Sequence, residues 1–219
     1  QMMTLRLRYM RQNDIHEVAA IDRLCFQPAW SHESYRFELN ESRSSHMVVL
    51  EKPSAANTAA HAGWLNELRG RLNGAAAERA RGDILGYGGI WSITDEAHIS
   101  TIATHPSQRG HGYGEILLAG MVGKALRLGA GYIVLEVRVS NQVAQKLYSK
   151  YGFSHFGRRR RYYASNNEDA WDMRLTLDGA ARQRFARLYA GLQSRHDLAD
   201  AFSSARHPRR IESSLYFAN

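Results

Sequence analysis

The sequence predicts an α/β protein in which helices pack against a mixed β-sheet. Two neighbouring apolar segments, Ile84–Ile93 and Ala97–Thr104, are rich in strand-forming residues and are separated by the turn Thr94–Glu96, so they predict a hairpin. After this hairpin, helical and strand patterns alternate along the chain, and that alternation favours helices packed on a sheet. The composition, 44% hydrophobic and 23% charged over 219 residues, is typical of a globular domain.

The N-terminal part predicts two helices and a strand. Apolar residues recur at helical spacing over Asp14–Cys25, and Ser31 is suited to cap a second helix that extends through Leu39. His46–Glu51 then has the apolar composition of a strand. Residues 52–83 are rich in alanine, glycine and charge, and they predict a partly helical insertion between two strands.

The part that follows the hairpin predicts two further helices and the remaining strands. A helix with its apolar face over Ile116–Leu126 is expected to end at Gly129, because glycine readily adopts the left-handed conformation that ends helices. Gly131–Val139 predicts a buried strand, and Gln142–Lys150 predicts the next helix. A second hairpin closes with Ala170–Leu177.

The chain is expected to form one domain over residues 1–177 with a C-terminal extension over residues 178–219. In this extension, Ala181–Leu192 carries apolar residues at helical spacing and predicts an amphipathic helix. The periodicity is lost from Arg195 onward, so we expect a weakly ordered tail there.

The composition also bears on partners and compartment. The net charge is +8, and the tightest basic cluster is Arg158–Arg161. Because such clusters bind phosphate groups or acidic partners, a basic ribosome- or RNA-binding module remains an alternative. Cys25 is the only cysteine, which is typical of a reducing compartment, and no apolar stretch reaches the roughly 18–20 residues that cross a bilayer. We expect a soluble, cytoplasmic protein, and the histidines show no His-Glu-x-x-His pair, so no metal site is expected.

A glycine-rich segment, Arg109–Gly114, joins a predicted strand to a predicted helix. Backbone N–H groups at a helix start have no intrahelical partners, so such a segment forms a cradle for an anion and predicts a phosphorylated ligand. Glu115 follows where a nucleotide-hydrolysing loop has lysine, which argues against that class. A dinucleotide-binding interpretation, with Glu136 as the acidic residue about twenty positions on, would make the protein an NAD-dependent oxidoreductase and stays open on these residues.

A carboxylate and a phenol follow the glycine-rich segment. Glu136 lies in the next predicted strand, and Tyr148 lies in the helix that Asn141 is expected to cap. A strand and the helix that packs over it can bring two such side chains to one cleft. Beside a phosphorylated carrier, these residue types could act as a base and an acid.

Several short motifs together carry a family resemblance. They are Ile102–Pro106, the Arg-x-x-Gly-x-Gly pattern of Arg109, Gly112 and Gly114, and the segments Leu135–Asn141, Leu147–Tyr148 and Tyr151–Phe153. This combination resembles the GNAT superfamily of N-acetyltransferases over about Leu5 to Leu177, apart from the insertion. Phe26–Ser31, Arg161–Tyr163 and Glu168–Met173 make the chain look more narrowly like the RimI-like ribosomal-protein alanine N-acetyltransferases.

The resemblance implies a GNAT fold, in which acetyl-coenzyme A lies in a wedge between two diverging strands. It implies Glu136 as the general base, acting through water, and Tyr148 as the general acid that protonates the departing thiolate. The implied cofactor-binding residues are Ile102, Ala103, Thr104, Arg109, Gly110, His111, Gly112, Tyr113, Gly114, Glu115 and Asn141. The implied acceptor-binding residues are Phe26, Trp30, Tyr162 and Tyr163.

The activity that the resemblance implies is transfer of an acetyl group to the α-amine of a protein or peptide N-terminus, with a ribosomal protein as the expected partner. A peptide α-amine has a pKa of about 7.7–8.0 and a lysine about 10.4, so one carboxylate base is enough for the former. The nearest enzymatic alternative is a small-molecule amine acetyltransferase. We expect no membrane partner and no specific nucleic acid, and a monomer or homodimer.

Overall fold

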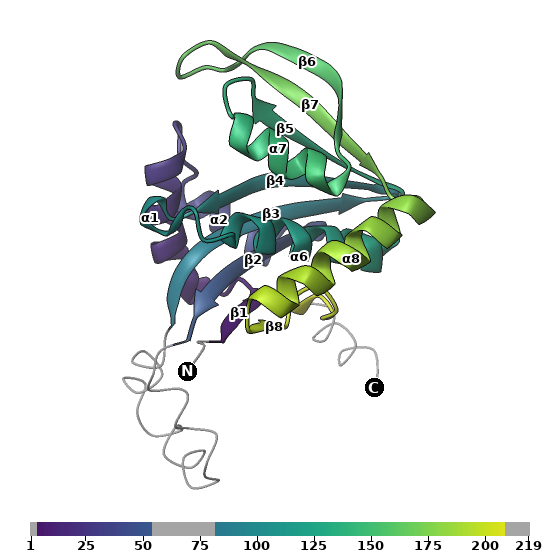
Figure 1. Cartoon of the computed structure of the whole chain (residues 1–219). Helices are drawn as coiled ribbons and strands as arrows, with labels where there is room; N and C mark the ends of the chain where they lie inside the picture. Colours follow the sequence, from purple (N-terminus) through teal and green to yellow (C-terminus); the bar gives the residue numbers. More distant parts are fainter. Residues whose placement is uncertain (1–3, 54–81, 209–219) are drawn as a thin grey trace, which may run out of the picture.

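The computed structural model of the protein describes residues 4–53 and 82–208 (Figure 1). Nearly all of the predicted insertion over residues 52–83 lies outside these ranges, as does the end of the predicted tail. Among the described residues, no helix combines the length and the apolar character needed to cross a bilayer.

The described residues form one eight-stranded sheet and five α-helices, as the sequence predicts for an α/β protein. The strands are β1 (Leu5–Tyr9), β2 (Ser45–Lys52), β3 (Asp83–Ile93), β4 (Glu96–Thr104), β5 (Tyr132–Arg138), β6 (Ser154–Tyr163), β7 (Glu168–Thr176) and β8 (Leu198–Asp200). The helices are α1 (Ile15–Cys25), α2 (His32–Asn40), α6 (Tyr113–Leu128), α7 (Gln142–Tyr151) and α8 (Gly179–Arg195).

The sheet is mixed but mainly antiparallel. The strand order is β6-β7-β5-β4-β3-β2-β1-β8, and only the pairs β4–β5 and β1–β8 are parallel. A dinucleotide-binding oxidoreductase of the doubly wound class needs a mainly parallel sheet. That alternative interpretation of the glycine-rich segment is therefore wrong.

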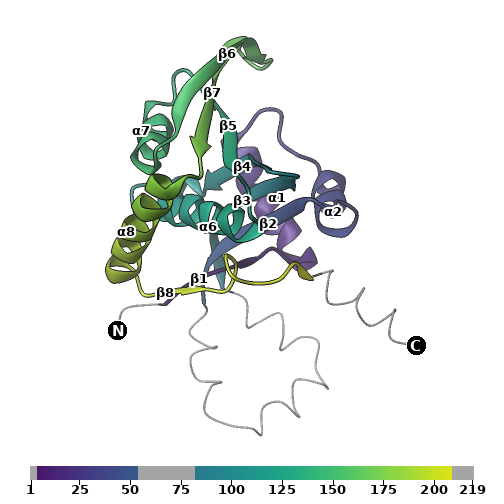
Figure 2. The same ribbon diagram turned by 90° about the vertical axis from the view of Figure 1, so that its right-hand side faces the viewer.

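Helices cover both faces of the sheet. In Figure 2, α6, α7 and α8 lie on one side of the strands, and α1 and α2 lie on the other. The interior strand β2 divides its side chains between two apolar cores, with Val48 and Leu50 in the core beneath α6, and Met47 and Val49 in the core beneath α1. This burial on both faces explains why β2 is a continuous apolar run.

Strands β4 and β5 diverge soon after they begin. They pair only at Glu96–Tyr132, Ala97–Ile133 and His98–Val134. Beyond these positions β4 remains paired with β3 as far as Thr104, and β5 remains paired with β7 as far as Arg138. The two strands therefore separate toward their carboxyl ends, on the left in Figure 1, and the expected wedge is confirmed.

The local signals for helix ends are also confirmed. The side chains of Ser31 and Asn141 each accept a hydrogen bond of 3.1 Å from a backbone N–H in the first turn of α2 and α7. Gly129 and Gly152 follow α6 and α7 with φ angles of +80° and +101°. Only glycine takes such angles without steric cost, so these two residues fix where the helices end.

The C-terminal segment differs from expectation. Helix α8 forms as predicted, but the described residues after it are not a weakly ordered tail. Strand β8 pairs in parallel with β1, and Phe202 is fully buried. The Lys124 Nζ donates a hydrogen bond to the Ala205 carbonyl at 2.7 Å, and Asp200 accepts hydrogen bonds from the N–H groups of Phe202 and Ser203. The ring of Phe202 and the turn at Asp200 hold this segment in place. Neither gives a periodic sequence pattern, so the order of the segment could not be predicted from spacing.

Candidate active site

Glu136 lies where the wedge opens. It is on β5, two residues beyond the last position that pairs with β4. Its Oε2 accepts a hydrogen bond from His98 Nε2 at 2.8 Å, and its Oε1 lies 2.8 Å from Nη2 of Arg159. The Arg159 Nε also donates to Asp172 Oδ1 at 2.7 Å, so the guanidinium is fixed between two carboxylates.

These partners decide the protonation state of Glu136. Burial alone would raise the pKa of its carboxyl, since only 11% of the side chain is exposed. The hydrogen bond from His98 and the charges of His98 and Arg159 outweigh burial and hold that pKa below its usual range. The carboxylate is therefore ionised near neutral pH, and its oxygens retain lone pairs that can accept a proton.

Glu136 and Tyr148 approach the wedge from opposite faces of the sheet. Leu135 and Val137 point into the core beneath α6 and α7, so Glu136 between them points to the face on which α1 and α2 lie. Tyr148 belongs to α7 and packs in the core of the other face. The opening between β4 and β5 is where these two faces connect, and among the described residues no hydrogen bond joins Glu136 directly to Tyr148.

Tyr148 is a buried, neutral phenol. It is 5% exposed, and its ring centroid lies 5.9 Å from that of Phe153. Burial raises the pKa of its hydroxyl well above the usual value, and the neighbouring Tyr163 adds to this effect. The hydroxyl stays protonated at neutral pH and can donate a proton or a hydrogen bond.

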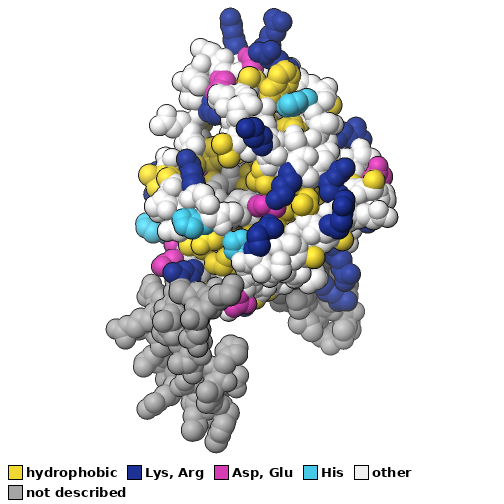
Figure 3. All heavy atoms as spheres, viewed as in Figure 1, with side chains coloured by type: hydrophobic (Ala, Val, Ile, Leu, Met, Phe, Trp, Pro, Cys, Tyr) yellow, Lys and Arg dark blue, Asp and Glu magenta, His cyan; other side chains and the backbone are white. Residues whose placement is uncertain are grey.

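The glycine-rich segment has the geometry of an anion cradle. Gly110 and Gly112 have φ angles of +84° and +80°, and Gly112 is the N-cap of α6. The backbone N–H groups of residues 110–114 donate no hydrogen bond to another described residue outside regular helices and strands. Such free donors, aligned with the positive end of a helix dipole, suit the pyrophosphate of coenzyme A. Figure 3 shows a recess with hydrophobic side chains between the α7 region and the start of α6.

The end of β4 leaves one strand edge open. Ile102, Ala103 and Thr104 pair with β3 on one side and have no partner on β5. Unpaired backbone groups at such an edge can hydrogen-bond the amides of a pantetheine chain, as an added strand would. The Cys25 Sγ lies 3.7 Å from the Thr104 carbonyl oxygen and 3.5 Å from Nη2 of Arg109, so the thiol lies beside this edge.

Two predicted cofactor residues are occupied by contacts within the protein. The Glu115 N–H donates to the Gly112 carbonyl, and the Glu115 Oε1 lies 2.6 Å from Nζ of Lys150. Asn141 uses its side-chain oxygen to cap α7, so its amide nitrogen is the polar group left for a ligand. His111 stacks on Tyr113, with ring centroids 5.5 Å apart.

The predicted acceptor residues form two separate groups. Trp30 lies with Phe26 in the loop between α1 and α2. Its backbone N–H donates a hydrogen bond to Asp22 Oδ2 at 2.6 Å. Tyr162 and Tyr163 lie at the end of β6 with their ring centroids 5.1 Å apart. Both the β6–β7 hairpin and α1 lie at the end of the sheet toward which β4 and β5 diverge (Figure 1).

Sequence reasoning missed His98 and Arg159 as partners of Glu136. His98 alternates with the buried Ala97 and Ile99 on β4, so its position on the Glu136 face could have been inferred from period-two spacing. In the sequence, Arg159 stands out only as part of the basic cluster Arg158–Arg161. Its partnership with Glu136 crosses β7 in the sheet, and no local pattern encodes it.

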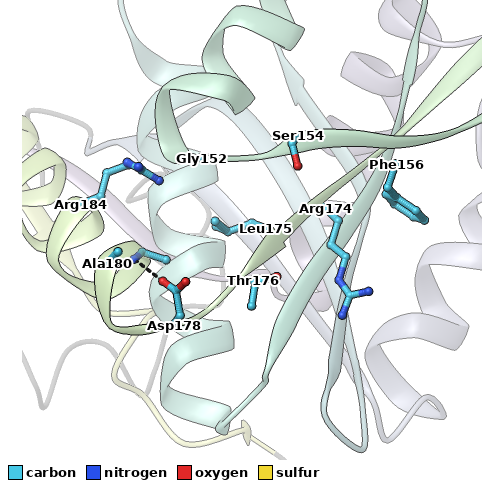
Figure 4. Close-up of a pocket in the computed structure, with 10 residues that line it drawn as sticks. Gly152, Ser154, Phe156, Arg174, Leu175, Thr176, Asp178, Ala180 and Arg184 are labelled. Atoms are coloured by element: carbon cyan, nitrogen blue, oxygen red, sulfur yellow. Dashed lines mark hydrogen bonds between the residues drawn. The ribbon is translucent and has the colours of Figure 1, made fainter.

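Two cavities that described residues line are found away from this region. One of about 270 Å³ lies between the β6–β7 hairpin and the start of α8, where Asp178 accepts a hydrogen bond from the Ala181 N–H at 2.8 Å (Figure 4). Arg174 and Arg184 also line it. The other, of about 430 Å³, lies beside β1 and α2. Neither is lined by a predicted site residue.

Comparisons with known proteins assign the family. A family model described as "Acetyltransferase (GNAT) family" matches residues 15–153. The "Putative ribosomal protein bS18-alanine N-acetyltransferase" of Bacillus subtilis (strain 168) is 34% identical over 172 residues, which is 78% of this chain and 95% of that protein. The "N-alpha-acetyltransferase RimI" of Mycobacterium tuberculosis is 35% identical over 117 residues, or 52% of this chain and 72% of that protein.

A solved structure agrees on the fold. The crystal structure of the ribosomal-protein-S18-alanine N-acetyltransferase from Escherichia coli has a TM-score of 0.60 and 22% identity, covering 80% of this chain and 95% of that chain. The splayed strands, the open edge of β4 and the cradle at the start of α6 fit acetyl-coenzyme A. The chain belongs to the GNAT family and is an N-acetyltransferase that uses acetyl-coenzyme A.

Proposed function

We propose that this protein acetylates the α-amine of a protein or peptide N-terminus, of the ribosomal-protein alanine type, with Glu136 as general base and Tyr148 as general acid. The observation that carries the proposal is the ionised carboxylate of Glu136 at the apex of the wedge, fixed by His98 and Arg159. It stands on one face of the sheet, while the neutral phenol of Tyr148 stands on the other.

The proposed reaction divides the two proton transfers between these residues. Acetyl-coenzyme A supplies an activated acyl thioester. Glu136 accepts a proton from the acceptor ammonium through a water molecule, which leaves the amine lone pair free to form the new C–N bond. The amine attacks the carbonyl carbon of the thioester, and the nitrogen then loses its second proton through water to solvent. Tyr148 donates its phenolic proton to the sulfur as the C–S bond breaks. The phenolate then takes a proton from solvent, and Glu136 releases its proton to solvent. No enzyme nucleophile is needed.

The pKa values favour an α-amine over a lysine. An α-amine with a pKa of about 7.7–8.0 is already partly neutral at pH 7.5, whereas a lysine near 10.4 is almost wholly protonated. Glu136 has its pKa lowered, so it is a weak base that suits the more acidic ammonium. A lysine would require a stronger base or extensive desolvation.

The relatives support the substrate class. The Bacillus subtilis relative, of which this chain covers 95%, is named a putative ribosomal protein bS18-alanine N-acetyltransferase. By this likeness we propose a ribosomal protein N-terminus as the acceptor, and hence the cytoplasm as the place of action. Tyr162 and Tyr163 on one side and the Phe26–Trp30 loop on the other would line the path of the peptide.

The test is a panel of synthetic peptides that differ in the first residue and share an internal lysine. The full chain is incubated with acetyl-coenzyme A, and tandem mass spectrometry locates the acetyl group. We expect acetylation of the α-nitrogen, fastest for a peptide that begins with alanine. A peptide with a blocked N-terminus is the matched control and should remain unmodified. If polyamines incubated in the same way were acetylated and no peptide were, the protein would instead be a small-molecule acetyltransferase.

A further inference from the structure

The appended helix α8 reaches the start of α6. It lies beyond residues 15–153, which the family model matches, and it crosses in front of α6 in Figure 1. Ala181 and Leu192 anchor it in the core that α6 also fills. Its last residue, Arg195, and the following residue, His196, are thereby held beside the glycine-rich segment.

Both residues make contacts there. Nη2 of Arg195 lies 3.8 Å from Oε1 of Glu115, in the first turn of α6. The imidazole Nε2 of His196 lies 3.4 Å from the point where a Cβ on Gly112 would stand, so the ring lies against the cradle backbone. Lys150 of α7 joins this group through its 2.6 Å ion pair with Glu115.

The negative charge of Glu115 beside the cradle must be offset by cationic side chains if the cradle is to bind phosphate. Glu115 places a carboxylate within the first turn of α6, where it opposes the approach of phosphate. Lys150 and Arg195 supply two positive charges against that one negative charge. Their side chains are 41% and 54% exposed, so solvent and a ligand can reach them while the carboxylate, 14% exposed, is covered. The surface that faces an incoming anion is therefore cationic.

We infer that Arg195 and His196, at the end of α8, belong with Lys150 to the phosphate-binding site for coenzyme A. Coenzyme A carries a pyrophosphate and a 3′-phosphate, and either can meet cations that border the free N–H groups of residues 110–114. The helix that follows the catalytic domain thus completes the cofactor site. The inference rests on the acetyl-coenzyme A dependence of the family and is independent of the acceptor.

The test measures binding, without turnover, by isothermal titration calorimetry of the full chain. The ligands are coenzyme A, 3′-dephospho-coenzyme A and pantetheine, and the variants are Arg195→Gln, His196→Gln and the double variant. Arg187→Gln is the matched control, because Arg187 is an exposed arginine on α8 about two turns before Arg195. His196→Gln leaves the ion pairs of Glu115 intact, so it separates direct contact from a change in Glu115.

Each single variant is expected to bind coenzyme A about fivefold more weakly, the double variant more so, and Arg187→Gln unchanged. A loss confined to coenzyme A assigns the contact to the 3′-phosphate, and a loss shared with 3′-dephospho-coenzyme A assigns it to the pyrophosphate. Either result supports the inference. Unchanged affinity of the double variant for coenzyme A, or an equal loss for pantetheine, overturns it.

Discussion

The imidazole Nε2 of His98 donates a hydrogen bond of 2.8 Å to Oε2 of Glu136, and His98 is the last residue of β4 that pairs with β5. The contact therefore bridges the two strands at the point where they begin to part. It holds the carboxylate at the apex of the wedge, within reach of both the acceptor face and the gap.

Replacing the base tests its role most simply. Glu136→Gln keeps the shape of the side chain and removes its charge, so we expect kcat to fall about 10²–10³-fold while coenzyme A affinity stays within twofold. Steady-state kinetics and calorimetry measure the two quantities. Unaltered kcat would remove Glu136 from the mechanism.

The pH profile of a His98 variant tests what lowers the Glu136 pKa. In the native protein the Glu136 pKa is below its usual range, so Glu136 stays ionised between about pH 5.5 and 9 and its titration does not affect kcat/KM there. In this range kcat/KM rises only as the acceptor amine loses its proton. His98→Gln removes the largest of the effects that lower the Glu136 pKa against burial, so this pKa should rise. The fall of kcat/KM on the acidic side should then occur at a higher pH than in the native protein. His16→Gln is the control, because His16 is an exposed histidine on α1, and this variant should leave the profile unchanged. Identical profiles for all three proteins would contradict this account.

The buried phenol is tested by removing one oxygen atom. Tyr148→Phe preserves the packing against Phe153, so we expect kcat to fall about 10²-fold with little change in melting temperature. Tyr132→Phe is the control, because the Tyr132 hydroxyl donates to Glu96 at 2.8 Å at the closed end of the wedge. If Tyr148→Phe kept full activity, the proton for the thiolate would have to come from another group.

The docked C-terminal segment predicts a stability effect. Phe202 is fully buried, with its ring centroid 4.8 Å from that of Tyr9 and Lys124 over its face. Phe202→Ala should lower the free energy of unfolding by about 3–5 kcal/mol, measured by chemical denaturation. Phe156→Ala, at a side chain that is 57% exposed on β6, should change it by less than about 1 kcal/mol. Equal stability of the two variants would show that the segment does not hold the sheet.

Much of the fold could be predicted because its signals are local. Ser31 and Asn141 mark helix starts, Gly129 marks a helix end, and the residue composition of Ile84–Thr104 marks a hairpin. Each depends on residues within one or two turns of the chain, which is the range over which propensity and capping act.

The rest depends on contacts between distant segments. Strands β1 and β8 are short and depend on distant segments, since β1 pairs with β2 on one side and with β8 on the other. The partners of Glu136 come from β4 and β6, and α8 approaches α6 only through tertiary packing. No sequence window contains both members of such a pair, so the network around Glu136 required the folded structure.

The most direct test is a crystal structure of the protein with a bisubstrate analogue, in which coenzyme A is joined through its sulfur to the α-nitrogen of an alanine-starting peptide. We expect the linker to pass between β4 and β5, with the peptide nitrogen on the Glu136 face and the phosphates at residues 110–114. A structure in which β4 and β5 pair along their whole length, or in which the peptide and coenzyme A lie on the same face of the sheet, would contradict this expectation.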